Sequence, residues 1–516
     1  MKFLVIATTI VAATLIAFPG HSATYCATLD SLDTDCSDGS CWLQSALHTA
    51  QGNSQDDTVK IVQGTHVSST YDGFNYNSYQ GYSLRLEGGY DASCTSQTLN
   101  PTNTIIDGAV DMGRLTLWNN SGGDIWVEGL TIQDSNWWNL SGMDIVTQVL
   151  NVGETGNITI SHNIVKNNVK GIYLSATDHT DQALTPGSIV IDYCVIENNT
   201  EGGLYAETVS DYGASGTLTV SNCEITGNDL NYLRTATIGG TARSIEVFDN
   251  LISGNSPTAP GGGLQISVDV GDGTGEGIII NSNHILDNTA SGDGGGLHIE
   301  APASGTASVS GAEVYLVNNI IAGNTSGGHG GGVHISSSAS GDAGDEGERL
   351  VINNTITGNT GAQWTETHGM LVRGRDDTLL QCFNNIIWGN GPGSGYDIRI
   401  WGSSSTTSDI YFNDFSTLFE TGVVNLGSNF DVNPAFVNAA NDDYHLSTGS
   451  DCIDTGDNSA PNVPAEDFEG DGRPYDGDNN GTATVDVGAD EFLPPPLIFA
   501  DGFETGNTLL WSATVG

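Results

Sequence analysis

Residues suited to carbohydrate binding recur along the chain at the spacing of one repeat. Tyr173, Tyr205, Gln265, His298 and His334 each stand between two apolar residues, at the same place in a recurring segment. In a β-strand those apolar neighbours point inward, so these side chains point outward. Tyrosine rings stack on sugars, while amides and imidazoles form hydrogen bonds with them. The spacing predicts a glycan-binding stripe, and the alternative is an ordinary exposed sheet surface.

Polar residues two positions further on extend the same outward face. They are Glu207, Ser267, Glu300 and Ser336. In the segment between Tyr205 and Gln265, the alternation places Arg234 in the stripe. His298 and His334, with Glu300 beside them, also have the ligand types that bind a transition metal, although no third imidazole stands in register. We expect glycan binding here rather than a metal.

A second set of ligand-type residues lies near the carboxyl end. Asp476, Asp478 and Asn480 alternate along residues 476–481, Asp-Gly-Asp-Asn-Asn-Gly, which matches the first half of a calcium loop. The glycine lets the chain fold so that alternate oxygens face one centre, and Thr482 can add a backbone carbonyl. Asp486 would close the loop one place earlier than the usual twelve-residue spacing. The pattern predicts a calcium site, with a simple acidic turn as the alternative.

Two further segments are candidates for catalysis on polysaccharides. Gly328-His329-Gly330 is similar to a hydrolase motif, but an inverting hydrolase also needs two carboxylates around a water, and the matching elements are missing. Arg373 and Arg375, beside Asp376-Asp377, form the best basic cluster for an elimination reaction, which needs a base and a cation. We expect these arginines to pair with nearby carboxylates at a loop. The sequence therefore predicts no catalytic residue.

These candidate residues belong to a repeat that fixes their positions. Residues 318–324, 353–359 and 384–390 share the pattern Asn-Asn-x-Ile-x-Gly-Asn. Looser copies have these residues at the second position: Leu130, Asn163, Cys194, Cys223, Asn250 and His284. The second positions lie 27 to 35 residues apart, a period typical of a solenoid. Another phrase, Gly-Gly-Gly-apolar-x-apolar, recurs once in several of these periods.

Both phrases alternate apolar and polar residues with a period of two, which is typical of β-strands. One coil cannot bury its apolar row alone, but coils stacked roughly 4.8 Å apart pair their strand edges and share a continuous core. Asparagine recurring at one register would then form a hydrogen-bonded ladder. The chain is predicted to be all-β: a right-handed parallel β-helix with a small amino-terminal cap and an irregular carboxy-terminal region.

The eight cysteines favour disulfides over metal sites, because no Cys-x-x-Cys spacing occurs. Four lie in the amino-terminal region and permit three connectivities: Cys26, Cys36, Cys41 and Cys94. Cys194 and Cys223 occupy the same register in adjacent coils, so we expect a disulfide between them, with two buried thiols as the alternative. Cys382 and Cys452 are expected to tie the last coils to the carboxy-terminal region.

The chain divides into five segments by composition. Residues 1–23 have a lysine, an apolar stretch and small residues at the end, as in a secretory signal peptide. Residues 40–50 have helical spacing, with Asp38 or Ser40 as the expected N-cap and Gly52 as the stop. The predicted segments are 1–23 signal peptide, 24–104 amino-terminal cap and first strands, 105–430 right-handed parallel β-helix, 431–492 irregular carboxy-terminal region, and 493–516 proline spacer and tail.

The chain is strongly acidic. Its 516 residues include 62 Asp plus Glu and 13 Lys plus Arg, which gives a formal net charge of −49. Such a surface repels nucleic acid and anionic membranes, and it disfavours an acidic polysaccharide unless calcium intervenes. After the leader no stretch is apolar and long enough to span a bilayer. A neutral or amino-sugar polymer is therefore the ligand class we expect, with solubility as the simplest role of the charge.

Three passages carry a family resemblance. They are residues 86–91 with 104–108, residues 433–437 with 444–446, and residues 467–473 closing on Asp-Val-Gly-Ala-Asp-Glu at 486–491. With the repeats, they make the chain resemble bacterial right-handed parallel β-helix repeat proteins that carry a choice-of-anchor Q domain. The resemblance spans nearly the whole chain after the leader. It implies an exported or surface-associated protein, with residues 431–492 as the anchor-like region.

The expected function follows from the stripe, the leader and the resemblance. We expect a secreted or outer-surface bacterial protein, monomeric and without catalytic activity, that acts in adhesion or glycan binding. Its partner would be a polysaccharide or a cell-surface glycan, and calcium is the one cofactor expected. The alternatives are a polysaccharide lyase or glycoside hydrolase with its site on the same stripe, and a purely structural surface solenoid.

Overall fold

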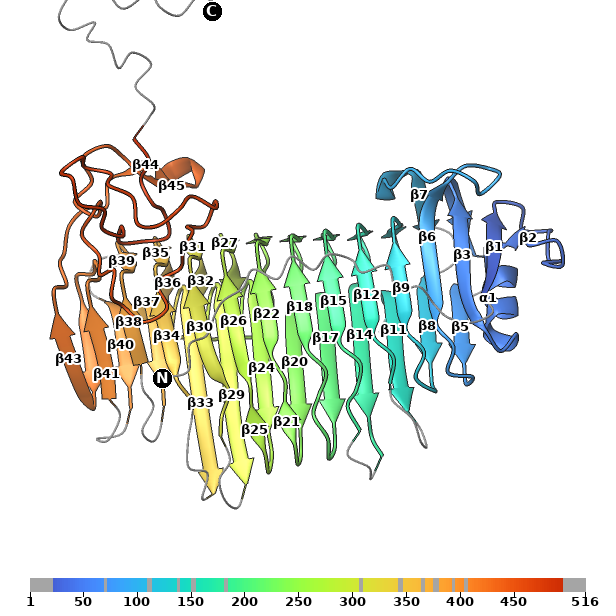
Figure 1. The fold of residues 1–516 in the computed structure, drawn as a ribbon, viewed down its shortest axis with the longest axis horizontal. Helices are drawn as coiled ribbons and strands as arrows, with labels where there is room; N and C mark the ends of the chain where they lie inside the picture. The colour runs from blue at the N-terminus through green and yellow to red at the C-terminus, as the bar shows by residue number, and fades with distance from the viewer. Residues whose placement is uncertain are drawn as a thin grey trace, which may run out of the picture.

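The computed structural model describes residues 22–494 with eleven gaps. The gaps are residues 69–71, 109–113, 137–139, 150–154, 181–183, 306–309, 342–346, 363–366, 375–379, 392–394 and 403–406. The expected signal peptide and tail therefore lie almost wholly outside the described residues, and Ser22 and Ala23 belong to the first strand. Figure 1 shows the coils stacked side by side along the long axis of the molecule.

Three long parallel sheets run the length of the solenoid. Sheet A contains, in spatial order, Ser40–Trp42 (β2), Ser22–Thr28 (β1), Asp56–Val62 (β3), Leu84–Tyr90 (β6), Ile125–Glu128 (β9), Ile158–Ser161 (β12), Ile189–Asp192 (β15), Leu218–Ser221 (β18), Ile245–Phe248 (β22), Gly277–Asn281 (β26), Glu313–Val317 (β30), Arg349–Ile352 (β34), Leu380–Phe383 (β38), Thr407–Tyr411 (β41) and Val423–Gly427 (β43). Sheet B contains Gly64–Val67 (β4), Thr104–Asp107 (β7), Thr131–Gln133 (β10), Ile164–Lys166 (β13), Val195–Glu197 (β16), Glu224–Thr226 (β19), Leu251–Ser253 (β23), His284–Leu286 (β27), Ile320–Ala322 (β31), Thr355–Thr357 (β35) and Ile386–Trp388 (β39).

Sheet C carries the predicted glycan stripe. Its strands are Phe74–Ser78 (β5), Leu115–Asn119 (β8), Ser141–Val149 (β11), Lys170–Asp178 (β14), Gly202–Ser210 (β17), Asn231–Thr237 (β20), Leu264–Val270 (β24), Leu297–Gly305 (β29), Val333–Gly341 (β33), Thr367–Arg373 (β37), Tyr396–Trp401 (β40) and Leu418–Thr421 (β42). The shorter elements are Thr241–Ala242 (β21), Thr274–Gly275 (β25), Thr289–Ala290 (β28), Thr325–Ser326 (β32), Thr360–Gly361 (β36), Phe436–Asn438 (β44), Asp443–Leu446 (β45), and the 3-10 turns Pro101–Asn103 (η1) and Ala439–Asn441 (η2).

Each strand of sheets A, B and C aligns with its counterpart in the next coil. Ile266, Ile299 and Ile335 hold one inward position in three successive coils, and each is fully buried. Rows of this kind from the three sheets form one continuous apolar core. The predicted fold class, an all-β parallel β-helix, is therefore confirmed. Within the part of the chain that the structure describes, no helix is long and apolar enough to cross a membrane.

The amino-terminal end is closed by one helix, Leu43–Gly52 (α1). Leu43, Ala46, Leu47 and Ala50 bury their side chains against the first coil. The helix ends at Gly52 as expected, but it begins after Trp42 and not at Asp38 or Ser40, because residues 40–42 pair with β1 instead. Two disulfides, Cys26–Cys94 and Cys36–Cys41, link this end of the chain. Because β1 and β3 already belong to sheet A, parallel stacking begins well before residue 105.

Asparagine ladders stabilise two corners of the coil. Oδ1 of Asn319 accepts hydrogen bonds from the backbone N and from Nδ2 of Asn283, both at 3.0 Å, and Nδ2 of Asn319 donates to the carbonyl of Ile280. A second ladder follows the opposite corner, from Asn168 to Asn390. The register places Asn283 in the first ladder and not His284, which pairs with Leu251 and Ile320 on the outward side. A slip of one residue reverses the side of the sheet to which a residue points.

The expected disulfide between Cys194 and Cys223 is wrong in this structure, because both side chains are free thiols. They occupy adjacent rungs of the first ladder, and the backbone N–H of Cys194 donates to Sγ of Cys223 at 3.3 Å. Each sulfur also lies against backbone carbonyls of its own coil and of the preceding one. Cys382 and Cys452 are likewise free and buried, the first against the ladder and the second beside Asp414.

Residues 431–494 form an irregular region that covers part of sheet B (Figure 1). It contains one short antiparallel pair, β44 with β45. Its Tyr444 and Ala489 pack on Leu286, Ile320 and Ala322 of the solenoid. The first asparagines of the three Asn-Asn doublets donate side-chain hydrogen bonds to backbone carbonyls of this region: Asn318, Asn353 and Asn384. In each doublet the first residue holds the carboxy-terminal region and the second builds the ladder.

Inside this region buried carboxylates, and not strand pairing, accept the hydrogen bonds of many backbone N–H groups. Asp486 accepts hydrogen bonds from the backbone N–H groups of Asp454 and Phe492, at 2.6 and 2.7 Å. Asp467, Asp490 and Glu491 accept backbone N–H groups in the same way. Arg473, fully buried, donates to the carbonyls of Gly488 and Ala489. The closing Asp-x-Gly-Ala-x-Glu motif is therefore structural.

Candidate functional site

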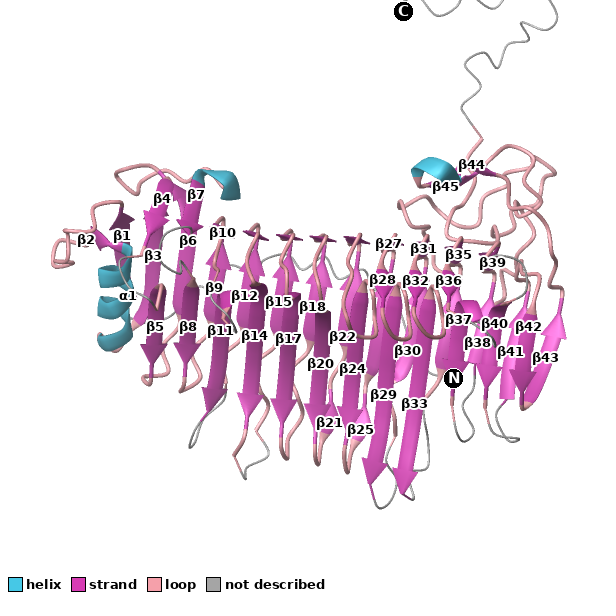
Figure 2. Cartoon of the chain, turned by 180° about the vertical axis from the view of Figure 1, so that it is seen from behind, coloured by secondary structure: helices cyan, strands magenta, loops and turns pink. Residues whose placement is uncertain are grey.

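The predicted stripe lies on the outer face of sheet C, whose strands Figure 2 shows running along the length of the solenoid. Backbone pairing aligns Tyr173, Tyr205, Tyr232, Gln265, His298 and His334 in successive coils, and we call this set the tyrosine row. The expected place of Arg234 is wrong, since Tyr232 holds that position. A shift of two residues keeps a side chain on the same face, so alternation alone cannot fix the register.

The tyrosines of this row stack on one another. The rings of Tyr173 and Tyr205 are 5.2 Å apart and nearly parallel, and those of Tyr205 and Tyr232 are 5.4 Å apart and tilted. Both hydroxyls of the first pair donate to Glu207, at 3.3 and 3.1 Å. Burial and the nearby Glu207 raise the pKa of Tyr173 to about 12, so its hydroxyl remains a donor. Because the facing ring surfaces cover each other, these tyrosines offer edges and hydroxyls to a ligand.

The two histidines of the row are buried, although the sequence predicted exposed side chains. His298 is 5% exposed and His334 is 4% exposed. Their Nδ1 atoms are 3.0 Å apart, and Nε2 of His298 is 3.3 Å from Oε1 of Glu300. Because Glu300 faces the other nitrogen of His298, the three side chains do not converge on one point. The transition-metal interpretation of this set is therefore not supported by the geometry.

A second row, two residues further along each strand, includes two exposed tryptophans. Its twelve aligned positions are Asn77, Trp118, Val146, Ser175, Glu207, Arg234, Ser267, Glu300, Ser336, Arg373, Trp401 and Thr421, and we call it the tryptophan row. Trp118 is 38% exposed and Trp401 is 43% exposed. Sequence reasoning missed both tryptophans. Each alternates with buried leucines or isoleucines, but neither strand follows the glycine phrase used to align the coils.

Charged side chains along this row are paired. Nε of Arg234 lies 2.6 Å from Oδ2 of Asp269, and its Nη1 lies 3.6 Å from Oε2 of Glu207. At the carboxy-terminal end, the guanidinium groups of Arg373 and Arg399 lie 5.1 and 5.0 Å from the centre of the Trp401 ring. Arg373 thus contacts an aromatic ring, whereas we expected it to pair with a carboxylate. Arg375 and Asp376-Asp377 lie outside the described residues.

The segment Gly328-His329-Gly330 forms a structural corner. The backbone N–H of His329 donates to Oδ1 of Asp293 at 2.7 Å, and Gly330 has a positive φ of 65°. A Cβ at Gly330 would lie 2.2 Å from the carbonyl oxygen of Val333, so a larger residue does not fit. This local packing accounts for the glycines without a catalytic role.

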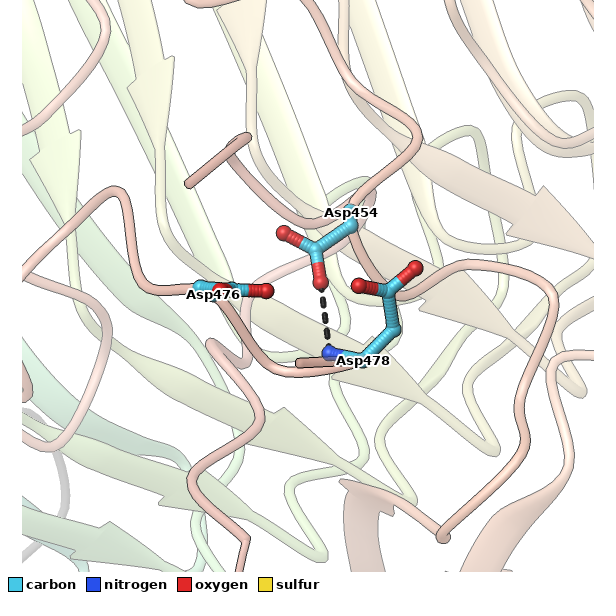
Figure 3. Close-up of side chains that lie close together, drawn as sticks. All are labelled: Asp454, Asp476 and Asp478. Carbon is cyan, nitrogen blue, oxygen red and sulfur yellow. Dashed lines mark hydrogen bonds between the residues drawn. The ribbon is translucent and has the colours of Figure 1, made fainter. Parts of the chain in front are cut away.

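The candidate calcium loop brings three carboxylates together (Figure 3). Oxygens of Asp454, Asp476 and Asp478 lie within 4.8 Å of one another, and among the described residues this is the one such group of His, Cys, Asp or Glu side chains. Asp454 was not predicted, and it takes the place expected for Asp486, which is committed to backbone N–H groups. The side chain of Asn480 folds back onto Asp478 and onto the N–H of Thr482. Oxygen ligands of this kind suit calcium.

Comparisons with known proteins agree with the fold. Residues 62–240 match the family described as right handed beta helix region. Similar solved structures include a pectate lyase Pel9A, with 10% identity, 92% of this chain and 96% of that chain covered, and a TM-score of 0.38. An Agl-KA catalytic domain has 15% identity, coverage of 80% and 69%, and a TM-score of 0.39. The Azotobacter vinelandii mannuronan C-5 epimerase AlgE6 A-module has 13% identity, coverage of 76% and 94%, and a TM-score of 0.32. No curated protein matches the sequence.

Proposed function

We propose that the outer face of sheet C binds an extended polysaccharide that lies along the solenoid, and that the protein acts in adhesion or glycan binding. The observation that carries the proposal is the tryptophan row. It contains two exposed indole rings, one near each end, with hydroxyl, carboxylate and guanidinium groups between them. Aromatic faces that contact sugar rings, with polar groups that fix the orientation of the ligand, are what a glycan site requires.

The dimensions of the row suit a polymer. Trp118 and Trp401 are separated by nine coil steps, from β8 to β40. At roughly 4.8 Å for each step the two indoles are about 43 Å apart, which accommodates several sugar residues. The tyrosine row runs beside it and adds the hydroxyl oxygens of Tyr173 and Tyr205 as acceptors, with Gln265 partly exposed in the same row. A neutral or amino-sugar polymer remains the preferred ligand, because the net charge of −49 opposes an anionic one.

A polysaccharide lyase or hydrolase with its site on this face is the second candidate. The observation that favours it is the buried pair His298 and His334, since buried titratable groups beside a ligand face are typical of catalytic sites. Incubating the protein with polysaccharides and measuring reducing ends and unsaturated products distinguishes the two functions. Binding without products supports the first, and products support the second.

Affinity electrophoresis in gels that contain neutral or amino-sugar polymers tests the binding site. We expect Trp118→Ala and Trp401→Ala each to weaken retention roughly tenfold, because each removes one ring from the row. Tyr193→Ala is the matched control, since Tyr193 is 54% exposed but lies at a different corner of the coil. Equal retention of all three variants and the parent would show that the face is only a sheet surface.

Two further expectations accompany this proposal. The disulfides Cys26–Cys94 and Cys36–Cys41 fit an extracellular protein, and we propose that it is secreted or displayed on the cell surface. We also propose that the Asp454, Asp476 and Asp478 cluster binds calcium and stabilises the loops of residues 431–494. In that role the ion is structural and takes no part in glycan contact.

A further inference from the structure

Glu300, His298 and His334 form a chain of contacts across two neighbouring strands of sheet C. The Nδ1 atoms of the two histidines are 3.0 Å apart, and Nε2 of His298 is 3.3 Å from Oε1 of Glu300. His298 in β29 and His334 in β33 are register partners, so the backbone holds both rings in place. The ring centres lie 4.8 Å apart. The carboxylate is partly exposed, whereas both imidazoles are buried.

The carboxylate determines which ring nitrogens carry protons. The hydrogen bond from His298 holds the pKa of Glu300 below its usual range against the opposing effect of burial, and Gln265 adds a second hydrogen bond. An ionised carboxylate only accepts hydrogen bonds, so Nε2 of His298 is the protonated nitrogen. With this one proton on His298, Nδ1 of His298 accepts, and Nδ1 of His334 donates to it. This order leaves Nε2 of His334 without a proton.

The surroundings of His334 keep the ring neutral and its Nε2 unpartnered. Burial, and next the neighbouring His298, lower the pKa of His334 to about 4; His329 and Arg373 act in the same direction, and Asp293 opposes them. Oδ2 of Asp293 is 3.8 Å from Nδ1 of His334, too far for a hydrogen bond. Within the described residues Nε2 of His334 makes no hydrogen bond, and the side chain is 5% exposed.

We infer that Glu300, His298 and His334 are a relay that presents the lone pair on Nε2 of His334 as a proton acceptor for a hydroxyl of the bound glycan. The inference rests on the proposed glycan-binding function and deepens it. His334 would select a glycan that has a hydroxyl donor at the point where it contacts this coil. In the alternative function, the same nitrogen replaces the arginines as the general base. In a hydrolase, an O–H bond of the attacking water then breaks and its proton joins Nε2, while the oxygen attacks the sugar carbon and the glycosidic oxygen leaves with the C–O electron pair and takes a proton from solvent.

Long-range proton–nitrogen NMR on protein with labelled histidines tests the relay without any ligand. At pH 7 we expect the Nε2–H form of His298 and the Nδ1–H form of His334. In Glu300→Ala the fixed order is lost, so His334 should show a mixture of both forms. Glu207→Ala is the matched control, because Glu207 lies on the same face three coils away and should leave both histidines unchanged. The Nε2–H form of His334 in the parent, or no change in Glu300→Ala, overturns the relay.

Alkylation by bromoacetate tests whether the lone pair is available at the surface. Nε2 of His334 would form the new N–C bond while bromide leaves with the C–Br electron pair, and the positive charge of Arg373 favours the anionic reagent. Peptide mapping should find the product on Nε2 of His334, several-fold slower in Glu300→Ala than in Glu207→Ala. Modification at Nδ1, or none at His334, contradicts the inference. Neither experiment contains a glycan, so failure of the relay and failure of glycan retention are separate results.

Discussion

His445 lies between two carboxylates at the surface of the carboxy-terminal region. Its Nδ1 is 2.6 Å from Oδ1 of Asp443, and its Nε2 is 2.8 Å from Oε2 of Glu469. Burial lowers the pKa of His445, but the hydrogen bonds with Glu469 and Asp443 outweigh it and raise the pKa to about 9. The hydrogen bond with His445 holds the pKa of Asp443 below its usual range. His445 and Asp443 therefore remain an ion pair over a broad span of pH.

This residue predicts a loss of stability in alkali. A histidine with a raised folded pKa contributes fully below its unfolded pKa near 6.5, and the contribution disappears as pH rises through about 9. Because the three side chains are 37 to 49% exposed, we expect about 1 kcal/mol or less. Thermal melting of residues 431–494 can be monitored by hydrogen exchange at several pH values from 6 to 10. The stability of this region should decline with rising pH in the parent and not in His445→Gln. The same slope in both would contradict the assignment.

At the scale of elements, the two asparagine ladders determine how coils stack. Each rung uses the carboxamide both as an acceptor for the preceding coil and as a donor to the core strand, so one residue satisfies several buried backbone groups. The thiols of Cys194 and Cys223 replace two rungs. A thiol is a weak donor and a weak acceptor, so these two rungs are the weakest in the ladder.

Substitutions at the ladder should therefore have opposite effects at different rungs. Asn319→Ala leaves buried N–H and carbonyl groups without partners and should lower the free energy of unfolding by about 2–4 kcal/mol. Cys223→Asn restores a carboxamide that can accept the N–H of Cys194, and we expect unchanged or higher stability. Chemical denaturation of both variants checks this prediction. A strong destabilisation by Cys223→Asn would mean that the site is too tight for the amide.

The acidic loop at Asp476 gives a prediction at the same scale. If calcium binds Asp454, Asp476 and Asp478, calcium at 100 times its dissociation constant should stabilise the loops by about 2.7 kcal/mol through mass action. Melting with excess calcium and with chelator should therefore differ in the parent and converge in Asp478→Ala. Asp451→Ala, an exposed acidic change outside the cluster, should behave as the parent. Equal melting of the parent with calcium and with chelator would leave only an acidic turn.

At the scale of the whole molecule, the carboxy-terminal region is attached to the side of the solenoid. It leaves the last coil and packs on β27, β31, β35 and β39 of sheet B and on β30, β34 and β38 of sheet A (Figures 1 and 2). Among the described residues it leaves sheet C uncovered. The proposed glycan face and the docked region therefore lie on different sides of the coil. This separation permits binding along sheet C while the carboxy-terminal region stays docked on the other sheets.

Loss of one docking contact should release this region without unfolding the solenoid. Asn353 donates hydrogen bonds to the carbonyls of Asp486 and Gly488, so Asn353→Ala should increase proteolysis within residues 431–494. Asn222→Ala is the matched control, because Asn222 has the same position in a coil that this region does not cover. Limited proteolysis followed by mass spectrometry locates the cuts. Equal cleavage of the two variants would indicate that apolar packing alone holds the region.

The sequence by itself determined the parallel β-helix, the closing helix and the asparagine ladder. A period of about thirty residues with alternating apolar positions buries its apolar side chains efficiently in one way. Equivalent positions of successive coils stack on one another. The outward direction of Tyr173, Tyr205 and Gln265 also followed from that alternation. Local pattern was sufficient in these cases because inward and outward positions differ by one residue.

Only the tertiary structure decided which residues share a site. Coil lengths vary, so alternation could not distinguish Tyr232 from Arg234, nor show that Trp118 and Trp401 belong to one row. Burial of His298 and His334, and their contact with Glu300, depends on groups from neighbouring coils. Asp454 joined the acidic cluster and Asp486 left it because the backbone N–H groups of a distant loop needed acceptors. Such choices depend on partners far apart in the chain, which no local spacing specifies.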